Sequence, residues 1–129
     1  MTIHPPAPSD SGTRLAADRT RLAYERTMMA WVRTATSLIS FGFTIYKFFQ
    51  YQTERGQAFV DRLIGPREFA VIMIIVGVSG LVLASVEHHQ SMKTLRATYG
   101  DMPRSTAGIV GGFIGVLGVL ALIAVILRQ

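Results

Sequence analysis

Three long stretches with few or no charges divide the chain. No charged side chain occurs in 105–127 or 69–86, and 28–49 is apolar apart from Arg33 near its start and Lys47 near its end. At about 1.5 Å per helical residue, even the shortest stretch extends roughly 27 Å, close to the ~30 Å hydrocarbon layer of a bilayer. The pattern predicts an all-α integral membrane protein with three transmembrane helices, over about 28–49, 67–87 and 106–127.

The segment before the first apolar stretch predicts a helix that begins outside the membrane. Residues 1–12 are rich in Pro and Ser and are predicted to be a disordered tail, followed by a three-span membrane domain over 13–129. No Gly or Pro lies between Arg14 and Phe41, so nothing interrupts a helix there. We therefore expect the first helix to extend unbroken from the cytoplasm into the membrane.

Helix-breaking residues set the remaining predicted boundaries. Pro66 suits the first turn of the second helix, and Gly100 suits the end of its polar extension. The connection 50–66 contains a weakly amphipathic run, which predicts a short helix lying on the external surface of the same membrane.

A seven-residue repeat precedes and enters the first apolar stretch. Three successive units begin at Leu15, Leu22 and Met29, and each has arginine fifth and threonine sixth. Because seven residues are about two helical turns, the arginines lie along one side of one helix. An arginine inside a transmembrane segment is costly and usually functional. The repeat therefore marks a candidate site, made of Arg19, Arg26 and Arg33.

The polar line continues through the membrane. From Arg33, steps of four and three residues lead along one helical face to Ser37, Ser40, Thr44 and Lys47. A straight helix drifts about 20° per heptad from such a line, so sustained alignment predicts a left-handed supercoil of helices.

Sequence spacing distinguishes the repeated arginines from Arg14 and Arg21, which lie in the same predicted helix. Arg14 has Asp18 four positions on, and Arg21 has Asp18 and Glu25 within reach. The repeated arginines have no carboxylate three or four positions away. They need partners from elsewhere.

Three interpretations of the unpaired arginines remain open. In the first, they hold anionic lipid headgroups, with Trp31 and Tyr24 as interface anchors. In the second, they form inter-helix ion pairs that fix assembly. In the third, copies of the first helix surround an axis, and rings of positive charge select anions. The carboxylates considered for the second are Asp18, Glu25 and Glu87.

Glycines in the third apolar stretch predict close helix packing. Gly108 and Gly112 have GxxxG spacing, as do Gly111 and Gly115, which lets a neighbouring backbone approach. We expect a homo-oligomer formed through the first helix and this glycine face.

Composition and charge restrict the function. Cysteine is absent, and His88 and His89 are adjacent on a predicted helix, so the chain offers too few ligands for a metal site. No catalytic set, nucleotide fingerprint or nucleic-acid module is visible, so we expect no enzyme activity, no cofactor and no nucleic-acid partner. Eight basic residues on one predicted side against five on the other place the N-terminus in the cytoplasm and the C-terminus outside.

The segment 22–34, L-A-Y-E-R-T-M-M-A-W-V-R-T, resembles the signature L-A-x-E-R-T-x-L-A-W-x-R-T. That signature belongs to the small three-span proteins of the domain-of-unknown-function family 202, the YidH-type inner-membrane proteins of bacteria. The segment is also similar to the membrane portion of the fungal vacuolar transporter chaperone complex, which makes polyphosphate and passes it through a membrane. Only Met29 and Tyr24 depart from the usual residues. The resemblance implies a ring of first helices, with Arg26 and Arg33 at motif positions.

Together these observations predict an oligomeric conduit for anions such as phosphate or polyphosphate in a bacterial inner membrane. Its lining would be Arg19, Arg26, Arg33, Ser37, Ser40, Thr44 and Lys47. The alternative is a non-conducting scaffold or accessory subunit that binds anionic lipid or a partner membrane protein.

Overall fold

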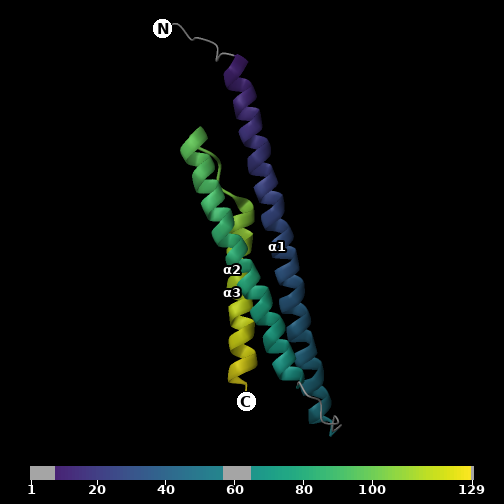
Figure 1. Ribbon diagram of the computed structural model, residues 1–129. Helices are drawn as coiled ribbons and strands as arrows, with labels where there is room; N and C mark the ends of the chain where they lie inside the picture. The colour runs from purple at the N-terminus through teal and green to yellow at the C-terminus, as the bar shows by residue number, and fades with distance from the viewer. Residues whose placement is uncertain (1–7, 57–64, 129) are drawn as a thin grey trace.

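Three long helices make up the part of the chain that the structure describes, residues 8–56 and 65–128 of a computed structural model (Figure 1). They are α1 (Pro8–Glu54), α2 (Pro66–Tyr99) and α3 (Thr106–Leu127), and each contacts the other two. The N-terminal end of α1 projects beyond the other helices. The prediction of an all-helical fold is confirmed. The surface helix predicted within 50–66 falls mainly on 57–64, outside the described residues.

The helix boundaries follow local chemistry. α1 begins at Pro8, earlier than predicted, so residues 8–12 are helical and not part of a tail. Proline is compatible with a first helical turn, because its fixed φ suits the helix and its missing N–H would have no partner there. α2 begins at Pro66 as predicted, and the Gly65 N–H donates to the Glu68 carboxylate. Gly100 ends α2 with a φ of 87°, which favours glycine.

One face of α1 forms the packing seam with α2 and α3. Its buried positions alternate by four and three residues, the spacing of a coiled-coil interface. From Met28 onward they are Met28, Val32, Ala35, Ile39, Gly42 and Tyr46, and Ala17 is buried further toward the N-terminus. This spacing keeps one side of the helix in contact along the whole length shared with its neighbours.

Two glycines lie where the backbones of α1 and α2 are in close contact. A Cβ at Gly42 would lie 3.0 Å from the carbonyl oxygen of Ala70, and one at Gly77 would lie 3.2 Å from that of Ala35. Backbone atoms cannot move aside as side chains do, so both positions need a small residue. Gly77 belongs to a weaker small-residue pattern with Gly80 and Ala84 in the sequence, whereas no pattern indicated Gly42.

The glycines predicted for helix packing have different surroundings. Gly111 accommodates the end of Met28 where a Cβ would clash, whereas Gly112 has nothing within 4 Å of that position. Cβ atoms at Gly108 and Gly115 would make ordinary contacts, with Ser105 and His88 and with Leu81. The glycines of α3 therefore lie on two sides of the helix, one packed against the rest of the chain and one open.

Candidate functional site

α2 and α3 are long and apolar enough to cross a membrane. Only 28% of the most apolar segment of α2 and 17% of that of α3 is buried within the chain, whereas the core helix of a soluble protein would be mostly buried. Large apolar side chains such as Leu83 and Phe113 are about 70% exposed. α1 is long enough to cross a membrane, but it is not apolar enough by the same standard. Arg33, Lys47 and several hydroxyl groups interrupt its apolar stretch.

α1 and α3 run parallel and in register. The backbone N–H of Ala107 donates to Oε2 of Glu25 at 3.4 Å, and the Tyr46 hydroxyl donates to the carbonyl of Arg128 at 3.4 Å. Both bonds join residues 82 positions apart. The segment of α1 between them therefore lies beside almost the whole of α3, over about 32 Å.

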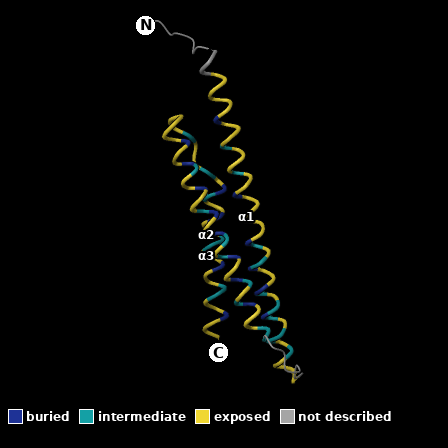
Figure 2. The backbone as a smooth tube through the Cα atoms, in the orientation of Figure 1, coloured by how far each residue is buried: buried dark blue, intermediate teal, exposed yellow. Residues whose placement is uncertain are grey.

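The predicted polar line lies on the side of α1 that faces away from α2 and α3. Arg33 is one position after Val32 and two before Ala35, about 100° and 200° around the helix from these seam residues. Exposed and buried positions alternate along α1 in Figure 2. We call the exposed side the outward face; its residues are Arg19, Arg26, Arg33, Ser37, Ser40 and Thr44, with Lys47 half-buried at its end.

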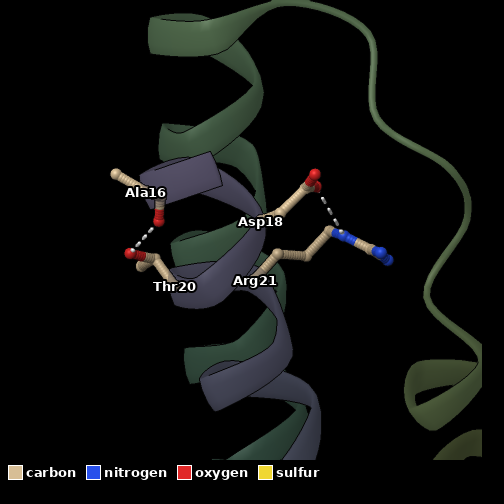
Figure 3. Close-up of polar contacts among 4 residues, drawn as sticks. All are labelled: Ala16, Asp18, Thr20 and Arg21. Atoms are coloured by element: carbon tan, nitrogen blue, oxygen red, sulfur yellow. Dashed lines mark hydrogen bonds and ion pairs between the residues drawn. The ribbon is translucent and has the colours of Figure 1, made fainter. Parts of the chain in front are cut away.

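The heptad repeat is also a repeat of structure. The hydroxyl of Thr20 donates to the carbonyl of Ala16 at 3.0 Å (Figure 3), and the corresponding bond recurs at 3.1 Å in each of the next two units. Ser37 and Thr44 likewise donate to carbonyls four residues earlier, at 3.0 and 2.7 Å. Because these hydroxyl groups donate hydrogen bonds within α1, the charged groups are the main donors that the outward face offers to a ligand.

The candidate carboxylates take different places. Asp18 lies 3.9 Å from Nε of Arg21 within α1 (Figure 3). Glu25 faces the N-terminus of α3, and Glu87 is exposed. Across residues 11–56 and 65–128, no ion pair joins two helices, and none involves the repeated arginines. Ion pairs between copies of the chain stay a prediction.

A polar cluster at the start of α3 was not anticipated. The Ser105 hydroxyl accepts from the N–H of Gly108 at 3.1 Å and lies 2.7 Å from Nε2 of His88. His88 is 6% exposed, and its Nδ1 has no hydrogen-bond partner among the described residues. Glu25 adds a negative charge at the same positive helix end. A serine just before an apolar helix is the sequence signal for such a cap.

These features define an α-helical membrane protein whose first helix carries a cationic outward face. The sequence profile described as Domain of unknown function (DUF202) matches residues 19–94, more than half of the chain. The chain therefore belongs to this family. The match begins at Arg19 and covers most of α1 and α2. No curated protein and no solved structure matches the chain.

Proposed function

We propose that this protein crosses a bacterial inner membrane three times and assembles into a homo-oligomer around the outward face of α1. The assembly forms a conduit for anions of the phosphate or polyphosphate type. The observation that carries the proposal is the position of the repeated arginines, which are exposed opposite the packing seam and lack carboxylate partners among the described residues.

The depth of each cation follows from the register of α1 with α3. Arg26 is next to Glu25, which contacts the start of α3, and Lys47 is next to Tyr46, which contacts its end. If α3 crosses the bilayer, these two cations lie near opposite surfaces. Arg33 then lies about 10 Å inside the surface near Arg26.

An arginine at that depth favours an interior surface over contact with lipid. Insertion measurements give a cost of about 2.5–3.5 kcal/mol for arginine at the centre of a membrane helix. A water-filled path between copies of α1 removes most of this cost, and a ring of guanidinium groups attracts anions into the path. Exposed alanines of the repeat, Ala16, Ala23 and Ala30, allow neighbouring copies to approach closely.

The orientation rests on the basic residues. Arg14, Arg19, Arg21 and Arg26 in α1 share one end of the bundle with Lys93, Arg96 and Arg104. The positive-inside rule assigns this end to the cytoplasm.

Flux through proteoliposomes tests the conduit. Liposomes containing the wild-type protein should release phosphate and pyrophosphate faster than protein-free liposomes, and Arg33→Glu should abolish the difference. Arg14→Glu is the matched control, because it makes the same charge change on an exposed residue outside the apolar stretch. Absence of flux from a well-folded wild-type oligomer would overturn the conduit.

A non-conducting scaffold is the second candidate, and the hydroxyl groups favour it. Because Ser37 and Thr44 donate within α1, they replace less of an anion's hydration shell than free hydroxyls would. In this case the outward face packs against a partner. Arg33→Glu then changes the mass of the complex, and neither the wild type nor the variant conducts anions. Mass photometry of both variants in nanodiscs, combined with the flux assay, separates the two candidates.

A further inference from the structure

A cavity of about 540 Å³ lies between the C-terminal part of α2 and the start of α3. None of its described lining residues comes from α1, so it is separate from the outward face. Its apolar part includes Met92, Gly108 and Ile109, and its polar part includes Ser105 and both neighbouring histidines, His88 and His89.

The charge around the cavity is positive. Lys93, Arg96 and Arg104 line it, and none forms an ion pair within the described ranges. The first N–H groups of α3 are already bonded to Glu25 and Ser105, so they add little to this charge. His88 also lines the cavity, and its Nε2 lies 2.7 Å from the Ser105 hydroxyl. The three cations together suit a phosphate group.

A separate apolar groove of about 440 Å³ lies further along α2 and α3. Among the described residues that line it, Ser85 alone is polar, and Gly112 and Gly115 provide space on the α3 side. Among the lining positions of the cavity and the groove, one series on each helix alternates by four and three residues and so follows one face of that helix. On α2 these positions are 78, 82, 85, 89, 92 and 96, and on α3 they are 105, 108, 112, 115 and 119.

We propose that cavity and groove together bind one anionic phospholipid. The phosphate occupies the basic cavity, just beyond the apolar stretch of α2, and an acyl chain lies in the groove. Over the α3 residues that line it, 111–120, the groove extends about 14 Å, close to the ~15 Å half-thickness of the hydrocarbon layer. The site uses α2, α3 and the connection between them, and it stands whether or not α1 lines a conduit.

Native mass spectrometry of the full chain released from detergent tests the site. Phosphatidylglycerol and phosphatidylcholine with identical acyl chains are the lipid probes, and pyrophosphate is the soluble probe. The cavity variant is Lys93→Ala/Arg96→Ala/Arg104→Ala. Its control removes three cations elsewhere, Arg14→Ala/Arg55→Ala/Arg128→Ala, so that both variants have the same net charge.

The groove is tested by Gly112→Leu, which places a side chain where the structure has nothing within 4 Å. Ala124→Leu is its control, because Ala124 is exposed on α3 and does not line the groove. Circular dichroism and gel filtration establish that all four variants keep the helical content and size of the wild type.

We expect the wild type to retain phosphatidylglycerol in preference to phosphatidylcholine. The cavity variant should bind it more weakly, by about fivefold for each cation removed. Gly112→Leu should also weaken retention, while both controls match the wild type. Equal retention by the cavity variant and its charge-matched control would overturn the proposal. So would displacement of the lipid by pyrophosphate with no effect of Gly112→Leu, which would assign the cavity to a soluble anion.

Discussion

The seam and the outward face of α1 both repeat every seven residues, but the seam is apolar and buried whereas the outward face is cationic and exposed. On the seam, residues such as Met28, Val32 and Ile39 are buried against α2 and α3. On the outward face, Arg26 and Arg33 recur at the same seven-residue interval and remain exposed. A heptad pattern therefore specifies two surfaces on one helix. The chain itself satisfies the first, and the second needs lipid, water, an anion or another copy.

The largest effect is expected when a charged residue is placed in the seam, and it is compared with an apolar residue placed at the adjacent position of the outward face. Val32→Arg places a cation in the seam, where Val32 is 6% exposed and lies against Gly111. We expect a loss of about 3–5 kcal/mol in the free energy of unfolding, because the buried charge has no partner. SDS titration followed by circular dichroism measures it.

The matched variant is Arg33→Val, one position further on. It should cost no unfolding free energy in the same titration, because Arg33 is exposed and makes no ion pair in the described part of the chain. A comparable loss in both variants would show that the outward face is also part of the folded core.

The second prediction concerns the helix crossing in the seam. Gly42→Leu should reduce the unfolding free energy by about 1–3 kcal/mol, because the new side chain pushes against the Ala70 carbonyl. Trp31 is the only tryptophan and packs near Gly80, so its fluorescence should report the separation of α1 and α2. Gly112→Leu, at an open position, should leave stability and fluorescence unchanged.

The third prediction concerns the edge of the seam, where Glu25 contacts the N-terminus of α3. Glu25→Ala should cost about 1 kcal/mol, because it removes both an acceptor for the Ala107 N–H and a negative charge near the helix dipole. Hydrogen exchange at Ala107 should quicken. Glu87→Ala serves as the control, since Glu87 is exposed, and an equal effect there would refute a specific cap.

The smallest effect is expected for the ion pair of Asp18 and Arg21. At 3.9 Å, and with the Asp18 side chain 61% exposed, the pair should contribute about 0.3 kcal/mol. A double-mutant cycle with Asp18→Ala and Arg21→Ala measures the coupling. A value above about 1 kcal/mol would mean that this pair, unlike the repeated arginines, helps to hold the fold.

The glycines show where prediction from sequence stops. The GxxxG spacing in α3 indicated close packing, yet Gly111 fits against Met28 while Gly112 faces open space. The two glycines nearest a neighbouring backbone carbonyl, Gly42 and Gly77, belong to no such motif within their own helices. Spacing identifies a small-residue face, but the partner helix and its rotation decide which glycine is contacted.

The sequence alone determined the helices, their main boundaries and the alignment of Arg19, Arg26 and Arg33, because these depend on local breakers and on a 3.6-residue period. Only the tertiary structure decided that this line faces away from α2 and α3. It also brought Lys93, Arg96 and Arg104 around one cavity beside His88. Both outcomes depend on how separate helices rotate and pack against one another, and no local pattern encodes that contact.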